Sequence, residues 1–299
     1  MVSRSNRALV LLPVLILLGS GQMGMVRAEV QLEASALEDY TERVQTGFID
    51  WGLGMAEVKV TATYDTVRFG GGHAMIRARE EADKKAEDAL FRLLRGVNIN
   101  GDRRLLGSPE MEKVLRKVIH KQMKIKDKRT ADLTLTATYQ VPIFGKKAVA
   151  DSLRGSLEED ALKPGELAGK GGGGYSSVLF DATGTSLQAA LYPRVFGAAG
   201  DLLYGPGDLS EKGWAKGSSA TYLVPSQASG KKSGLPKALA RRLGNNPLVL
   251  KVQKIKGILL ADVELHEEQE QTLKDAGVGD LLAAGHVFFL QTASVDVTQ

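Results

Sequence analysis

The chain has 299 residues, of which 43% are hydrophobic and 25% are charged. This balance is typical of a globular protein, and it excludes a disordered chain, a collagen-like chain and a polytopic membrane protein. The absence of cysteine excludes disulfides, thiolate metal sites, cysteine nucleophiles and a lipid-modified cysteine. The length predicts about two domains.

The N-terminus predicts a cleavable secretory signal over residues 1–28. An apolar run at 8–19 precedes a small-residue cleavage site, which predicts cleavage between Ala28 and Glu29. The alternative is a retained membrane anchor. The apolar run is shorter than the ~20 residues that a spanning helix requires, and Pro13 interrupts it. We therefore expect a periplasmic protein that is exported and not lipid-anchored, with no membrane span in the mature chain.

Cleavage would almost remove the excess of positive charge. The formal net charge is +4, with 39 basic and 35 acidic side chains. Arg4, Arg7 and Arg27 lie in the signal, which has no acidic residue, so 36 basic side chains remain in the mature chain. A nearly neutral chain gives no reason to expect nucleic-acid binding.

Residues 29–155 predict a first module of strands and helices. Alternation of apolar and polar residues predicts strands, and apolar spacings of three and four predict helices. The longest helix, at 73–95, carries an alanine-rich stripe that we expect to lie against a sheet, with Met75 on the same stripe. The other elements expected here are helices at 34–44, 109–121 and 147–157, and strands at 47–51, 55–67, 123–126 and 131–142.

Residues 156–174 predict a linker, because the segment is acidic, contains proline and ends in a glycine run. A second module is expected over 175–299. Its predicted strands lie at 175–182, 187–196, 202–204, 220–225 and 286–292, with a hairpin of 247–255 and 258–265 and a helix at 267–282. The fold class is therefore α+β, with an antiparallel or mixed sheet packed on one or two helices in each module.

No motif in the chain predicts catalysis. The glycine run at 169–174 matches G-x-G-x-x-G, but it precedes a strand, whereas a dinucleotide loop follows a strand and opens a helix. The S-x-x-K match at 229–232 lies in a Gly/Ser/Lys loop rather than on a helix. The four histidines have no paired spacing. We therefore predict no enzyme, no metal and no cofactor.

The first module resembles the Lpp-twenty-like lipoprotein family and the N-terminal module of flagellar assembly protein T. The resemblance covers about 47–142. It rests on Ile-Asp-Trp at 49–51 and on a helix that ends in D-A-x-x-x-L-L-x-G-V at 88–97. The lipid-anchoring cysteine of the lipoproteins is absent.

The second module is similar to a block found in longer exported relatives. The likeness comprises Y-x-x-V-L-F-D-A-x-G at 175–184, A-A-L-Y-P-R-V-F at 189–196 and L-Y-G at 203–205. The resemblance implies an α+β envelope protein that acts as a structural or assembly factor, with the flagellar basal body as its sharpest version. The implied partner is another envelope or flagellar protein. The sequence does not predict an oligomeric state.

The candidate binding residues come from these two blocks. Asp88 and Arg92 lie one helical turn apart, where a surface ion pair is the simplest expectation, and Asp181 and Arg194 lie in the second block. The alternative function is a periplasmic ligand-binding protein or enzyme with a site between the modules. In that case Asp181 and Arg194 would converge with Asp262 and Glu264 around a deep pocket.

The signal prediction has a direct test. The intact mass of the exported protein should correspond to a chain that starts at Glu29, because this site follows the apolar run at the usual distance. A mass that retains residues 1–28 would contradict both cleavage and release from the membrane.

Overall fold

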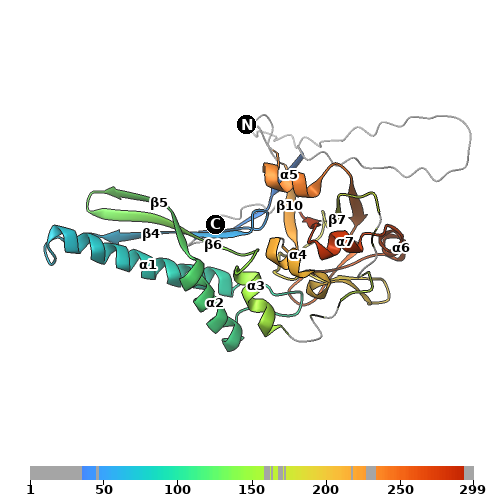
Figure 1. Ribbon diagram of the computed structural model, residues 1–299, viewed down its shortest axis with the longest axis horizontal. Coiled ribbons are helices and arrows are strands. Elements are labelled where there is room, and N and C mark those ends of the chain that lie inside the picture. The colour runs from blue at the N-terminus through green and yellow to red at the C-terminus, as the bar shows by residue number, and fades with distance from the viewer. Residues whose placement is uncertain are drawn as a thin grey trace, which may run out of the picture. The chain divides into compact units, whose positions relative to one another are not determined.

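A computed structural model gives the arrangement of the helices and strands (Figure 1). It describes residues 36–44, 47–157, 162, 164–167, 171, 173–216, 218–226 and 234–292. The predicted signal, its cleavage site at Ala28 and Glu29, and the S-x-x-K match at 229–232 lie outside the described residues, as does part of the predicted linker.

The first sheet is antiparallel and has the strand order β2-β3-β4-β6-β5. Its centre is the pairing of β4 with β6, which runs without interruption from Met55 opposite Pro142 to Thr63 opposite Thr134. The strands are β2 (Thr41–Val44), β3 (Gly47–Asp50), β4 (Met55–Thr63), β5 (Lys124–Ala131) and β6 (Thr134–Pro142).

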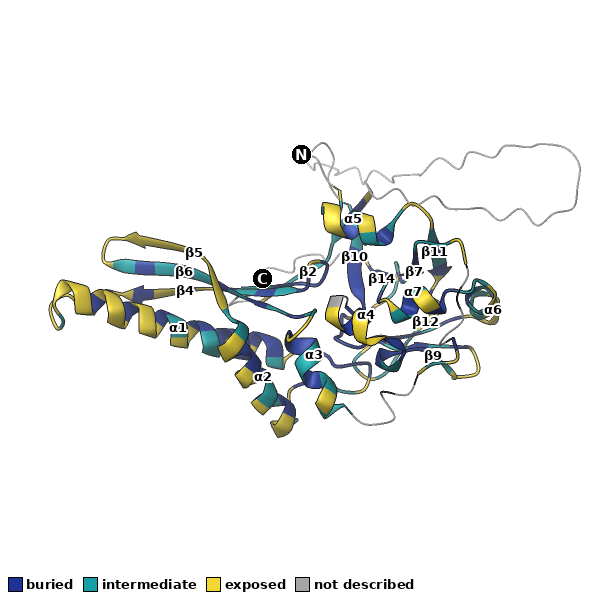
Figure 2. Ribbon diagram, viewed as in Figure 1, coloured by how far each residue is buried: buried dark blue, intermediate teal, exposed yellow. Residues whose placement is uncertain are grey.

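The strand predicted at 123–126 is longer in the structure, where it forms β5 and ends at Ala131. All residues of β5 are exposed, and the strand lies at one edge of the sheet (Figure 2). Two residues join it to β6, and both have positive φ, 47° at Asp132 and 58° at Leu133. Two positive values are typical of the tight turns that match the twist of a hairpin.

Helices α1 (Gly71–Arg95) and α2 (Pro109–Gln122) pack against this sheet. The predicted alanine stripe is buried, with Ala78, Ala82 and Ala86 each at most 1% exposed. Small side chains let α1 approach β4 closely, and the hydroxyl of Tyr139 on β6 donates a 2.6 Å hydrogen bond to Asp83 on the helix. The prediction for Met75 is wrong: it is exposed, and Ala74 takes the buried position.

Two further sheets lie among the described residues, and all of their strands except β1 come from the second part of the chain. A mixed sheet has the order β1-β10-β14-β7-β11, and a smaller sheet has the order β12-β13-β8-β9. Their strands are β1 (Leu37–Asp39), β7 (Ser177–Asp181), β8 (Val195–Phe196), β9 (Leu202–Tyr204), β10 (Thr221–Pro225), β11 (Pro247–Lys251), β12 (Lys254–Lys256), β13 (Asp262–Glu264) and β14 (Val287–Leu290). The described helices are α3 (Val149–Leu153), η2 (Arg154–Ser156), η4 (Pro206–Asp208), α4 (Glu211–Lys216), α5 (Lys237–Leu243), α6 (Glu267–Asp275) and α7 (Gly279–Ala283). The α+β class is as predicted.

The chain passes from the mixed sheet to the antiparallel sheet at Tyr40. Its N–H donates to the carbonyl of Tyr222 on β10, and its carbonyl accepts from the N–H of Trp51, which follows β3. Trp51 is buried, meets the ring of Tyr222 edge-on at 5.6 Å, and donates a 2.9 Å hydrogen bond to Glu42. Backbone bonds and a buried indole thus hold the two sheets together.

The helix predicted at 34–44 is wrong, because the described part of this segment forms β1 and β2. Leu37–Asp39 pairs with β10, and Thr41–Val44 pairs with β3. Tertiary strand pairing overrides the local helical preference, which is a weak prior even in a segment with several good helix formers.

The strand predicted at 187–196 shrinks to Val195–Phe196. The backbone N–H groups of Leu191 and Tyr192 donate instead to the carbonyls of Asn98 and Ile99, at 2.9 and 2.8 Å. Distant partners therefore satisfy the backbone of this segment, and no sheet ladder is needed.

Two predictions near the C-terminus need correction. The expected hairpin is formed by β12 and β13 alone, because β11 pairs in parallel with β7. The helix predicted at 267–282 is divided into α6 and α7 at Gly277, whose φ of +60° is unfavourable for other residues.

A continuous core crosses the predicted boundary between the modules. One cluster of buried side chains joins residues of α1 and β4, such as Ala82 and Val58, with residues of β7 and β14, such as Phe180 and Phe289. Residues 32–299 group as one compact unit. This shared core does not test where the chain divides, and the division into 29–155, 156–174 and 175–299 stays a prediction from composition.

Two carboxyl groups meet where the sheets join. Asp50 at the end of β3 is buried beside Asp39 of β1 and accepts a 2.7 Å hydrogen bond from the N–H of Leu53. Burial raises the pKa of Asp50 to about 6; the charge of Asp39 adds to the rise and the bond from Leu53 opposes it. Near pH 5 the folded protein therefore binds a proton at Asp50 that the unfolded chain releases.

Substitution at α1 should separate its buried face from its exposed face. Ala86→Leu should lower the free energy of unfolding by about 1–3 kcal/mol, because a larger side chain overpacks the contact with the sheet. Asp88→Ala, two residues further along, should cost about 0.5 kcal/mol or less, because its carboxylate is half exposed. Urea unfolding of the full exported chain measures both, and a reversed order would invert the assigned faces.

Asp50→Asn should change the pH dependence of stability. The raised pKa means that the contribution of Asp50 is fully present below about pH 4 and is lost as the pH rises through about 6. The variant should lack this loss, and at pH 7.5 it should be more stable than the wild type by about 1–2 kcal/mol.

Urea unfolding at pH 4, 5, 6 and 7.5 measures this effect. Asp132→Asn in the exposed β5–β6 turn controls for the loss of one negative charge. If Asp50→Asn keeps the slope of the wild type between pH 4 and 6, the carboxyl pair does not control this pH dependence.

Candidate functional site

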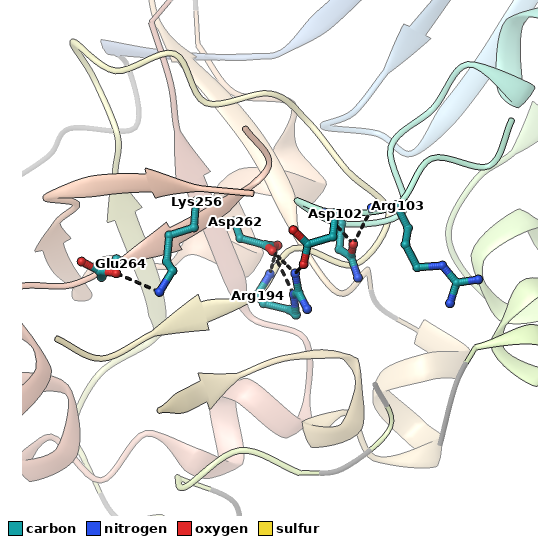
Figure 3. Close-up of polar contacts among 7 residues, drawn as sticks. Asp102, Arg103, Arg194, Lys256, Asp262 and Glu264 are labelled. Atoms are coloured by element: carbon teal, nitrogen blue, oxygen red, sulfur yellow. Dashed lines mark hydrogen bonds and ion pairs between the residues drawn. The ribbon is translucent and has the colours of Figure 1, made fainter. Parts of the chain in front are cut away.

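Arg194 and Asp262, two residues of the predicted site between modules, do meet in the structure (Figure 3). The carboxylate of Asp262 is fully buried and accepts from the backbone N–H of Arg194 at 2.9 Å and from its Nε at 2.8 Å. Nη2 of Arg194 donates to Asp262 and also to Asp102. The position of Arg194 just before β8 and of Asp262 at the start of β13 makes them neighbours, because β8 and β13 are parallel partners.

The loop that supplies Asp102 packs tightly against this pair. A Cβ atom on Gly101 would lie 2.5 Å from the carboxylate of Asp262, so only glycine fits there without a shift. Gly257 has a φ of +81°, and a Cβ on it would lie 2.3 Å from the carbonyl of Gly101. That same carbonyl accepts from the N–H of Leu259 at 2.8 Å. Gly101 thus seats the loop against Asp262 of β13 and the residues that follow β12.

The electrostatics of this cluster are those of a structural ion pair. Burial raises the pKa of Asp262, and Arg194 and the N–H of Gly101 oppose the rise. Burial alone would lower the pKa of Arg194, but the two carboxylates outweigh it and raise the pKa. Asp262 uses its hydrogen-bonding capacity on protein donors, so this buried carboxylate joins a loop to a sheet and is not presented to a ligand, whereas the Asp102 side chain stays more than half exposed.

The other two residues of the predicted site do not join this cluster. Asp181 accepts from the N–H of Thr183 at 2.9 Å and pairs with Lys251 at 3.0 Å. Glu264 pairs with Lys256 at 2.9 Å on the neighbouring strand. The structure thus brings together Arg194 and Asp262 only.

A groove lies elsewhere, on the first sheet, between α1 and β4. It has a volume of about 800 Å³. Its walls are Lys85, Asp88, Ala89 and Arg92 of α1, residues 57–61 of β4, the adjoining ends of β2 and β3, and Thr138. Two of the candidate residues from the sequence, Asp88 and Arg92, therefore line this α1–β4 groove.

The walls of the α1–β4 groove carry more positive than negative charge. The cations are Arg43, Lys59, Lys85 and Arg92, and the acids are Glu57 and Asp88. Both acids contact cations outside the walls: Glu57 lies 2.6 Å from Lys126, and Asp88 lies 3.8 Å from Arg116 on α2. The expected pair of Asp88 with Arg92 is not among the ion pairs of the described residues, where Arg116 takes that place.

The groove and the roles of Gly101 and Asp102 could not be predicted from the sequence. The groove depends on the register of β3 against β4, which apolar periodicity does not determine. A signal for the loop was present, because the polar segment 100–104 lies between residues that turn out to be buried, Ile99 and Leu105.

A family model matches the second part of the chain. Residues 177–293 match the family model described as the second domain of Treponema pallidum Tp0624. The match covers less than half of the chain and includes Asp181, Arg194, Asp262 and Glu264. None of the curated proteins compared with the chain matches it significantly. The match does not reach 47–142, so the resemblance to the Lpp-twenty-like family stays a prediction.

The described residues contain no group of three or more histidine, aspartate or glutamate side chains placed to hold a metal ion. Within the same part of the chain, no helix combines the length and the hydrophobicity needed to cross a bilayer.

The energetic role of the Arg194–Asp262 pair can be measured with a double-mutant cycle. Asp262→Leu should destabilise the chain by about 3–5 kcal/mol, because it leaves the Arg194 cation without its buried partner. The double variant Asp262→Leu/Arg194→Met should be more stable than the sum of the single effects predicts.

Urea unfolding gives all four free energies of the cycle. The exposed pair of Asp181 with Lys251 is the matched control, and Asp181→Leu should cost about 1 kcal/mol or less. Additive effects at Arg194 and Asp262 would show that the two side chains are not coupled.

Proposed function

We propose that this protein is a non-enzymatic periplasmic envelope protein that acts as a structural or assembly factor and binds its partner in the α1–β4 groove. The compartment rests on the predicted signal, and the class rests on the resemblance of residues 47–142 to envelope proteins. The flagellar basal body is the sharpest version that the resemblance implies.

The observation that carries the proposal is the position of Asp88 and Arg92. Both lie in the part of α1 that carries the resemblance, and both line the described groove. The charged residues of the alternative site form pairs within the protein, as Arg194 does with Asp262 and Asp181 with Lys251. The groove is therefore the better candidate for contact with another molecule.

Site-specific photo-cross-linking in intact cells tests this proposal. A benzophenone side chain in place of Arg92 should form an adduct with an envelope protein, and the same group in place of the exposed Glu268 on α6 should not. Lys59→Glu in the opposite wall should weaken the adduct from position 92. No adduct at position 92, or equal adducts at both positions, would contradict binding in the groove.

A further inference from the structure

The strand that forms one wall of the groove is longer than its partner on that side. β3 pairs with β4 only from Met55 to Val58. Residues 59–63 of β4 keep their pairing with β6 on the other side. Among the described residues, no strand pairs with 59–63 on the side where β3 ends. The antiparallel sheet therefore has an open edge five residues long, formed by residues 59–63 of β4 on the side where β3 has ended.

The backbone groups that face this open edge can be assigned. The N–H of Tyr64 donates to the carbonyl of Leu133 on the β6 side. Backbone groups alternate between the two sides of a strand, so those of Thr63, Thr61 and Lys59 face the open edge. The ammonium of Lys85 confirms this direction, because it reaches the carbonyl of Thr61 at 3.0 Å from α1.

Positively charged side chains outnumber acidic ones around this open edge. Lys59, Lys85 and Arg92 lie beside it, and the acids of the groove already contact Lys126 and Arg116. An arriving chain would meet backbone groups that no described strand pairs on this side, of which the Thr61 carbonyl holds only the Lys85 ammonium, and it would meet an excess of cations. Both features match an extended segment that carries carboxylates.

The geometry points to strand addition: an extended, acidic segment of a partner protein pairs with β4 at 59–63. The segment would span roughly 16 Å, at about 3.3 Å per residue. It would donate to the carbonyl of Thr61 in place of Lys85, whose ammonium keeps Glu81 as one partner and would take a carboxylate of the segment as another. This inference rests on the proposed function and names the class of partner.

Lysines at sheet edges also act in the opposite sense, because they discourage pairing between edges. Lys85 differs from such a blocking residue in one respect. It belongs to a separate element, bonds to one carbonyl of the edge and pairs with Glu81 on its own helix at 2.6 Å, so an arriving N–H can take over the carbonyl while the ammonium keeps an ionic partner. A basic or neutral strand would gain no such compensation, which makes the two roles separable by experiment.

Selection from a random heptapeptide display library against the full exported chain tests strand addition. The chain should enrich acidic peptides. Thr61→Pro should weaken their binding about tenfold or more, because it removes an edge N–H and distorts the edge. Thr61→Val keeps the N–H and the β-branched shape and should bind as the wild type does. Lys85→Met should weaken binding of acidic peptides severalfold.

Peptides synthesised with alternate N-methylated backbones provide a second measurement that does not depend on a stable Thr61→Pro variant. They should not bind, because they lack donors for the edge. Binding that survives both Thr61→Pro and N-methylation would overturn strand addition, as would enrichment of basic or neutral peptides, or no enrichment. A dimer of the chain that Thr61→Pro dissociates would show that a second copy occupies the edge, and it would also overturn the proposal.

The two proposals fail separately. If position 92 cross-links to an envelope protein and no acidic peptide pairs with the edge, the groove binds its partner through side chains and only strand addition is wrong. If neither result is obtained, the proposed function is wrong as well.

Discussion

The close contact of α1 with the pair of strands β4 and β6 is the constraint on which the first sheet depends. Alanine at three successive turns of the helix, Ala78, Ala82 and Ala86, leaves room for the backbone of α1 to approach the sheet. The hydroxyl of Tyr139 adds a bond to the helix. Because β4 is held by β6 along one edge and by α1 on one face, it stays extended beyond the point where β3 ends. The open edge and the α1–β4 groove are consequences of that support.

Charges in the described part of the chain serve two different purposes. Asp262 is withdrawn from solvent and pairs with the partly buried Arg194, which also binds Asp102, so the cluster holds the loop at Gly101 against the smaller sheet. The cations along the groove exceed the acids there and remain within reach of a partner. A charged side chain is thus a good guide to function here only when its neighbours leave it uncompensated.

The sequence predicts the elements whose periodicity is long and whose partners are near. The nine-residue alternation of β4 and β6 and the alanine spacing of α1 lead to correct predictions. The segments at 34–44 and 187–196 are mispredicted because distant residues determine their backbone bonds: β10 pairs with the first, and Asn98 and Ile99 bond to the second. Asp88 and Arg92 are correctly placed on the exposed side of α1, but the groove beside them depends on the register of β3 against β4, which starts at Gly47 opposite Val58 and which no local pattern encodes.

The most direct test of the account is amide hydrogen exchange of the full exported chain along β4. The open edge predicts an alternating pattern, with fast exchange at Lys59, Thr61 and Thr63 and slow exchange at Val60 and Ala62, whose N–H groups face β6. Uniformly slow exchange from 59 to 63 would contradict the account, because it would mean that another segment already covers this edge.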